Sequence, residues 1–168
     1  MSTTDLKVND EYYTPEHVWA DIKNYIPKGK VIWEPFNSIK DKRSLDSSRN
    51  LRSLGFKVVT RTYNPDTNKN DFFNSNYGDI VVSNPPFSMK REVLERLKHL
   101  NKPFILLLPH ATMNTKYFRN MFKSDKDFGI IIPKKRVDFV NKKNDSSNCF
   151  ECSYYCWKVG VRGLNWIS

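Results

Sequence analysis

Ile80-Val81-Val82-Ser83-Asn84-Pro85-Pro86-Phe87 is the most distinctive stretch of this chain of 168 residues. Its first four residues predict a buried strand, and the two prolines cannot donate hydrogen bonds to a sheet and hold the next loop in one extended shape. This loop suits a flat ring with a polar edge, because Asn84 and the Pro85 carbonyl can accept hydrogen bonds from an exocyclic amino group while Phe87 stacks on the ring. The alternative interpretation is a stiff connector between the strand and a helix that Ser88 caps.

Strand and helix patterns alternate on both sides of this stretch. Strands are expected at 30–34, 56–60, 79–83, 103–108, 128–132 and 152–159, and helices at 15–26, 44–54, 88–100 and 117–122. Thr14 before Pro15 is typical of a helix N-cap, and Gly55 is typical of a helix end. The alternation predicts an α/β fold with a doubly wound sheet, whose ligands bind at the carboxyl ends of the strands. The length predicts a single domain over residues 1–168.

The composition favours a polyanionic partner. The chain has a formal net charge of +10 and contains 14% aromatic residues. These values favour nucleic acid as the binding partner. The alternative is that the basic residues only form a solvated surface. The residues expected to contact phosphate are Lys40, Lys42, Arg43, Lys90, Arg91, Lys134, Lys135, Arg136, Lys142 and Lys143. No apolar run of 18 residues and no charged-then-apolar leader occurs, so we expect an intracellular, soluble protein of the cytoplasm or nucleus.

Three cysteines lie close together near the end of the sequence, at Cys149, Cys152 and Cys156. A zinc site would need a fourth ligand from a remote histidine. Buried free thiols explain the pattern more simply, because Cys152 and Cys156 fall on one face of the expected strand. We therefore predict no metal. His110, after the strand at 103–108, is either a surface loop residue or part of a pocket.

Val82-Ser83-Asn84-Pro85-Pro86-Phe87 resembles the catalytic motif of the S-adenosylmethionine-dependent adenine-N6 nucleic-acid methyltransferases. That motif is a hydrophobic strand ending in Asp or Asn, then Pro-Pro, then an aromatic residue. Tyr13-Thr14-Pro15, Glu34-Pro35-Phe36 and Asp71-Phe72-Phe73 resemble three further elements of the same family. The resemblance extends from about residue 12 to 159. It implies a class I methyltransferase-like, Rossmann-like domain, mostly parallel with an antiparallel C-terminal strand and without a separate target-recognition domain.

The resemblance also implies roles for particular residues. The implied catalytic residues are Asn84, Pro85, Pro86 and Phe87, and the implied cofactor-binding residues are Tyr13, Thr14, Pro15, Glu34, Pro35, Phe36, Asp71 and Phe72. The N6 amino group of adenine is a poor nucleophile, and two acceptors at the motif would favour a pyramidal nitrogen aligned with the methyl donor. A strong base is not needed. The target base, in DNA or less favourably RNA, must be unpaired or flipped out of its helix.

Three residues depart from the family pattern. Ser38 and Lys40 occupy positions of two cofactor-loop glycines, where a serine adds strain and a lysine adds bulk and charge. Arg61 stands where such folds usually offer an acid to the ribose of the cofactor. The sequence therefore leaves three functions open: an adenine-N6 DNA methyltransferase, an inactive methyltransferase-fold subunit that binds nucleic acid or activates a partner, and a structural or assembly protein. A protein partner would supply any target specificity, because the loops at 109–114 and 141–148 are short.

Overall fold

The computed structural model describes residues 13–36, 46–61, 64, 66–67, 70–139 and 151–168. Within these residues, seven strands form one sheet in the order β2-β1-β3-β4-β6-β5-β7. The strands are β1 Val31–Trp33, β2 Lys57–Val59, β3 Ile80–Ser83, β4 Phe104–Pro109, β5 Phe128–Ile132, β6 Cys152–Trp157 and β7 Gly163–Trp166. The first six correspond to the six strands expected from the sequence. The expectation missed β7, which pairs with β5.

The strand directions confirm a doubly wound sheet. β1 runs parallel to β2 and β3, β3 runs parallel to β4, and β5 runs parallel to β7. β6 lies between β4 and β5 and is antiparallel to both. The expected antiparallel strand is therefore present, although β7 and not β6 is the last strand. Because the chain continues from β1 to one side of the sheet and from β3 to the other, the carboxyl ends of β1 and β3 flank a topological switch point.

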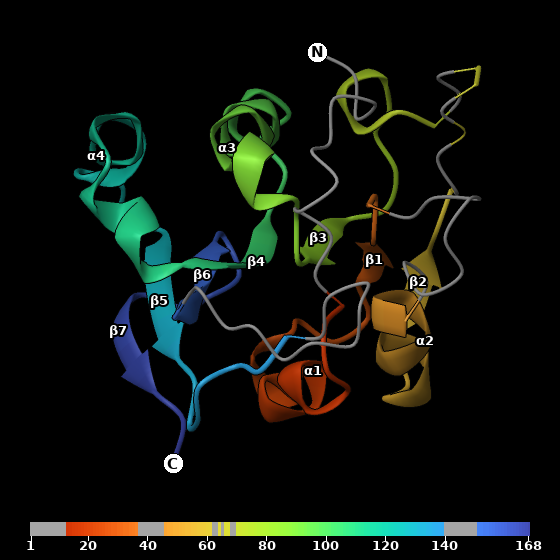
Figure 1. Ribbon diagram of the computed structural model, residues 1–168, viewed down its shortest axis with the longest axis horizontal. Helices are drawn as coiled ribbons and strands as arrows, with labels where there is room; N and C mark the ends of the chain where they lie inside the picture. Colours follow the sequence, from red (N-terminus) through yellow and green to blue (C-terminus); the bar gives the residue numbers. More distant parts are fainter. Residues whose placement is uncertain (1–12, 37–45, 62–63, 65, 68–69, 140–150) are drawn as a thin grey trace.

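Helices cover both faces of the sheet. Figure 1 shows α1 (His17–Asp21) and α2 (Asp46–Ser53) on one face, and α3 (Lys90–His99) and α4 (Lys116–Phe122) on the other. Each face has its own core, because neighbouring residues of a strand point to opposite sides. One core joins α1 and α2 to the sheet, and the other joins α3 and α4 to it. All six residues of β4 are buried, as expected for a strand covered on both faces.

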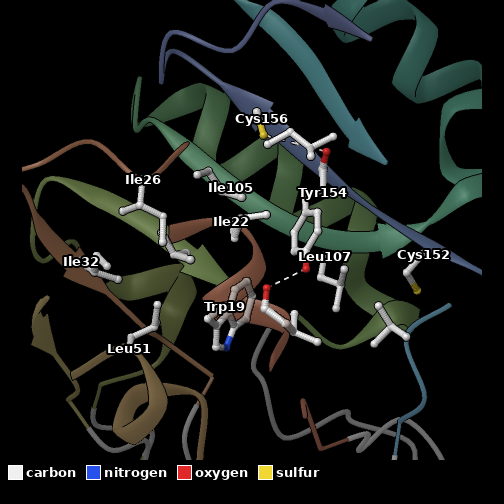
Figure 2. Packing of buried hydrophobic residues seen from close by; sticks show 14 of the residues in the cluster. Trp19, Ile22, Ile26, Ile32, Leu51, Ile105, Leu107, Cys152, Tyr154 and Cys156 are labelled. Carbon is white, nitrogen blue, oxygen red and sulfur yellow. Dashed lines mark hydrogen bonds between the residues drawn. The ribbon is translucent and has the colours of Figure 1, made fainter. Parts of the chain in front are cut away.

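β6 contributes to both cores. Cys152, Tyr154 and Cys156 belong to the α1 core, whereas Tyr155 and Trp157 belong to the α3 core. The Tyr154 hydroxyl donates to the Val18 carbonyl of α1 at 2.6 Å, the dashed contact in Figure 2.

The cysteines of β6 are buried free thiols, as expected. Burial raises the pKa of Cys152 to about 12. Cys149 lies outside the described residues, and among those that are described no group of three or more His, Cys, Asp or Glu side chains could hold a metal ion.

Two expected helix starts are wrong. The helix expected at 15–26 is the shorter α1 followed by the 3-10 turn η2 (Lys23–Tyr25), and its N-cap residue is Glu16 rather than Thr14. The helix expected from Ser88 begins at Lys90, because a 3-10 turn, η5 (Phe87–Met89), precedes it. Pro86, with φ −56° and ψ 125°, leads into this turn. By contrast, Gly55 ends α2 as predicted, with a φ of 94°.

No helix in the described part of the chain is long and apolar enough to cross a membrane.

Candidate functional site

The Asn-Pro-Pro-Phe motif lies at the carboxyl end of β3, at the switch point. All four residues of β3 are buried, and Asn84 is the first residue beyond it. Pro85 and Pro86 are also buried, and the Pro86 carbonyl accepts a hydrogen bond from the Met89 amide at 3.1 Å, within the turn η5. The prolines thus join the strand to α3 by a rigid connection that holds Asn84 at the edge of the sheet.

Thr14 contacts the motif directly. The side-chain nitrogen Nδ2 of Asn84 donates to Thr14 Oγ1 at 3.1 Å, and Thr14 is 8% exposed. Thr14 does not cap α1, because that helix begins at His17 with Glu16 as its N-cap residue. Tyr13 and Pro15, on either side of it, are half-buried. The structure therefore brings the Tyr13-Thr14-Pro15 element next to Asn84.

Glu34 lies on the other side of the switch point, directly after β1. Its carboxyl group is buried, and Oε1 accepts hydrogen bonds from Ser83 Oγ at 2.5 Å and from the Phe36 amide at 3.2 Å. Burial raises the pKa of Glu34 to about 7, against the smaller opposing effect of these hydrogen bonds. Ser83 therefore connects the end of β3 to the end of β1. The sequence analysis gave Ser83 no such role. A polar residue at the end of an apolar strand could have indicated a hydrogen bond at this edge of the sheet.

Asp71 and its aromatic neighbours extend the site from Glu34. Asp71 is fully buried, and its Oδ1 accepts from the Phe73 amide at 2.8 Å, which caps the 3-10 turn η4 (Phe72–Asn74). The rings of Phe36 and Phe72 lie 5.0 Å apart, so the Glu34-Pro35-Phe36 and Asp71-Phe72-Phe73 elements are in contact. The structure thus joins two sequence elements for which the same ligand was expected.

The carboxyl groups and rings near the switch point are mostly buried. Phe36 is half-buried and can supply apolar contact to a ring, whereas Glu34, Asp71 and Phe72 are buried and could meet a ligand only after neighbouring residues move. The raised pKa of Glu34 also keeps much of its carboxyl group protonated near pH 7. The Arg61 guanidinium lies 5.4 Å from the centre of the Tyr77 ring and places positive charge beyond β2. Ser38 and Lys40 lie outside the described residues.

Phe87 is buried in this structure. Its expected role, stacking on a base, needs an exposed ring. Phe87 is 6% exposed and meets Phe139 edge to face, with ring centres 6.0 Å apart. Phe139 and its buried neighbour Val137 belong to the segment that follows β5, and the sequence analysis singled out neither. A base could stack on Phe87 only after Phe139 moves.

One basic cluster lies at the same edge of the sheet as the motif. Lys134, Lys135 and Arg136 are exposed and follow the carboxyl end of β5. Arg136 is close enough to Cys152 to oppose the rise of its thiol pKa. These residues are therefore placed where a polyanion at the switch point could meet them.

The other expected phosphate contacts differ in their surroundings. Lys90 Nζ donates to the Phe87 carbonyl at 3.2 Å. Arg91 forms an exposed ion pair with Glu95 at 2.8 Å. Lys40, Lys42, Arg43, Lys142 and Lys143 lie outside the described residues.

His110 is part of this edge rather than a free surface residue. It follows β4, which lies beside β3, and its Nδ1 is 3.0 Å from the hydroxyl of the buried Ser153 in β6. The half-buried ring is therefore held next to the motif strand.

Comparison with known proteins gives a sequence likeness to a methyltransferase. No family model matches the chain. It is 30% identical over 96 residues to a type II methyltransferase of Mycoplasma genitalium, an alignment of 54% of the chain and 30% of that relative. The chain thus spans less than a third of the relative's length. Among solved structures, the modification subunit of a putative type I restriction enzyme from Vibrio vulnificus YJ016 aligns with 94% of this chain and 47% of its own, at 10% identity and a TM-score of 0.49.

Proposed function

We propose that this chain carries the methyl-transfer site of an adenine-N6 methyltransferase that acts on DNA, less favourably RNA, with S-adenosylmethionine as cofactor. The observation that carries the proposal is the position of Asn84, held by Thr14 at the carboxyl end of β3 and next to the buried pair of Glu34 and Ser83. This is the position in a doubly wound sheet where ligands bind. The sequence likeness to a methyltransferase supports the same chemistry.

In this proposal the protein aligns the reacting groups. The Asn84 side-chain oxygen and the Pro85 carbonyl accept hydrogen bonds from the amino group of adenine and hold its nitrogen towards the methyl donor. Glu34, Phe36, Asp71 and Phe72 would hold the cofactor, whose sulfonium supplies an activated methyl group when bound. Phe87 would stack on the flipped base after Phe139 has moved away.

Methyl transfer can be measured directly. We expect purified protein, incubated with methyl-labelled S-adenosylmethionine and adenine-containing DNA, to produce N6-methyladenine detectable by mass spectrometry of the digested nucleosides. The same assay with single-stranded DNA and RNA would define the substrate. Folded protein that binds nucleic acid but methylates none of these substrates would contradict the proposal.

A second candidate function is a subunit that binds nucleic acid without methylating it. Two observations favour it: Arg61 stands at the expected ribose position, and Phe139 covers Phe87. Calorimetry separates the two functions, because the enzyme must bind S-adenosylmethionine and the inactive subunit need not. Nucleic-acid binding without measurable cofactor binding would favour the second candidate.

We predict that the cluster of Lys134, Lys135 and Arg136 contacts phosphate. Changing all three to alanine should weaken DNA binding and reduce the slope of log K against log salt by about 2 to 3, because each lost phosphate contact lowers it by about 0.9. The matched control is the triple alanine variant of Lys23, Lys28 and Lys30. These three residues are exposed and belong to the segment that leads into the amino end of β1.

The control removes the same charge at the opposite edge of the sheet. Fluorescence anisotropy across a salt series gives both slopes. An equal loss of DNA affinity and an equal change of slope in the two triple variants would show that net charge, and not this cluster, determines binding.

A further inference from the structure

Trp166 in β7 is the one exposed tryptophan of the four in this chain. The other three are at most 3% exposed, whereas Trp166 is 68% exposed. Leaving a large apolar ring in water costs free energy, and the face of an indole can stack on another flat ring. Among the described residues, Leu164 in the same strand is the other exposed large hydrophobic side chain. The outer strand of the sheet therefore presents apolar surface to solvent.

The strand pairing places Trp166 beside the basic cluster that follows β5. Trp166 pairs with Ile132, the last residue of β5, and the Ile167 amide donates to the Ile132 carbonyl at 3.2 Å. The exposed residues Lys134 and Lys135 come shortly after Ile132. Because β5 and β7 are parallel, Trp166 lies at the carboxyl edge of the sheet, the edge that also holds the Asn-Pro-Pro-Phe motif.

The helix layer does not extend over β7. Paired residues of neighbouring strands point to the same face of a sheet, so Leu164 and Trp166 share the face of Ile130 and Ile132. Ile130 is 8% exposed and belongs to the core beneath α3 and α4. Figure 1 shows β7 beyond β5, at the outer edge of the sheet. The cover of this face thus ends at β5 and leaves the tryptophan ring accessible.

The charge of this region indicates which partner fits it. Residues 133–139 contain three basic side chains and one acidic side chain, and the whole chain has a net charge of +10. A second copy with the same charge would be repelled. A nucleic-acid strand, by contrast, offers phosphates to the lysines and a flat base to the ring. The bases of a duplex already stack on one another, so the ring fits an unpaired base.

We infer that Trp166 is a stacking platform for an unpaired base of a nucleic-acid strand whose phosphates meet Lys134 and Lys135. The inference rests on the proposed function only for the nucleic-acid partner, and it does not require methyl transfer. It adds a base contact outside the motif, in a region where the sequence analysis expected phosphate contacts alone.

Oligothymidylate of about 12 nucleotides tests this contact apart from the methyl-transfer site, because thymine has no amino group for the motif to bind. Trp166→Ala should weaken its binding about 10-fold, the usual effect of removing one stacking ring, and Trp166→Phe should retain most of the affinity. The slope of log K against log salt should not change in Trp166→Ala, because no charge is lost.

Leu164→Ala is the matched control. It removes the other exposed apolar side chain of β7, which pairs with Ile130 and so lies farther from the basic cluster. Its Kd for oligothymidylate should stay within about twofold of the wild-type value. Fluorescence anisotropy of a labelled oligonucleotide across a salt series gives all of these values.

Intrinsic fluorescence reports on the ring itself. Because the other three tryptophans are buried, an oligonucleotide that stacks on Trp166 should quench the emission of the wild-type protein. The same oligonucleotide should bind Trp166→Phe without quenching its emission. A duplex of the same length should quench the wild-type protein less.

Four results would overturn the inference: no binding of oligothymidylate by the wild-type protein, no quenching on binding, equal affinities of the wild type and Trp166→Ala, or an equal loss in Leu164→Ala. A wild-type dimer in sedimentation velocity that becomes a monomer in Trp166→Ala would also overturn it, because a second copy would then cover the ring. If oligothymidylate behaves as expected but no substrate is methylated, the proposed function fails and this contact is upheld. If methylation occurs and Trp166→Ala binds like the wild type, the inference alone fails.

Discussion

Glu34→Gln is expected to make the folded protein more stable above neutral pH by about 3 kcal/mol. Burial raises the pKa of Glu34 from 4.5 to about 7, and one pKa unit corresponds to about 1.4 kcal/mol. Below pH 4.5 the carboxyl group is protonated in both the folded and the unfolded chain. As the pH rises towards 7, the unfolded chain releases this proton while the folded chain keeps it, so the folded state loses stability. Above pH 7 the whole penalty is present.

Glutamine resembles the protonated acid and removes this pH dependence. Urea unfolding of the wild-type protein and of Glu34→Gln between pH 4.5 and 8.5 should therefore give curves that agree at low pH and diverge above it. Glu95→Gln is the matched control, because Glu95 is exposed in its ion pair with Arg91 and should change stability little at any pH. A constant difference between wild type and Glu34→Gln across the range would exclude a buried, protonated Glu34.

Asn84→Ala is expected to lower the rate of methyl transfer by about 10²- to 10³-fold, the usual effect of removing one preorganised hydrogen-bonding group from an active site. The calorimetric Kd for S-adenosylmethionine should change little, because the described cofactor candidates Glu34 and Asp71 are untouched. Asn114→Ala is the matched control. It removes the same amide from an exposed position in η6 (His110–Asn114), which follows β4 at the same edge of the sheet.

Single-turnover methylation at saturating DNA and cofactor gives the rate. Retention of most of the wild-type rate by Asn84→Ala would remove this residue from the chemistry. A loss of equal size in Asn114→Ala would mean that the edge as a whole, rather than the motif, responds to substitution.

The sequence predicted the core strands well, because their signal is local. The run from Phe104 to Leu108 is apolar at every position, and the structure buries all of it. β7 has no comparable signal: it is a four-residue strand that begins with Gly163 and exposes Leu164 and Trp166. It becomes a strand only because β5 is beside it.

Parts of the candidate site could not be predicted for a related reason. The bond between Glu34 and Ser83 joins residues 49 positions apart, and it exists only because β1 and β3 pair in a particular register. The contact of Phe139 with Phe87 likewise depends on the path of the chain after β5. The motif itself was visible because two prolines restrict the backbone locally. The roles assigned to its residues stay predictions.

The central position of β6 has a consequence for how the molecule is made. β4 and β5 are synthesised before β6, yet each of these two strands pairs with β6 and they do not pair with each other. Tyr154 of β6 also bonds to the Val18 carbonyl, across 136 residues. We expect a gap between β4 and β5 in the partly synthesised chain until β6 is made and pairs with both strands. Such late, long-range closure makes folding slow, and it exposes two sheet edges to other nascent chains meanwhile.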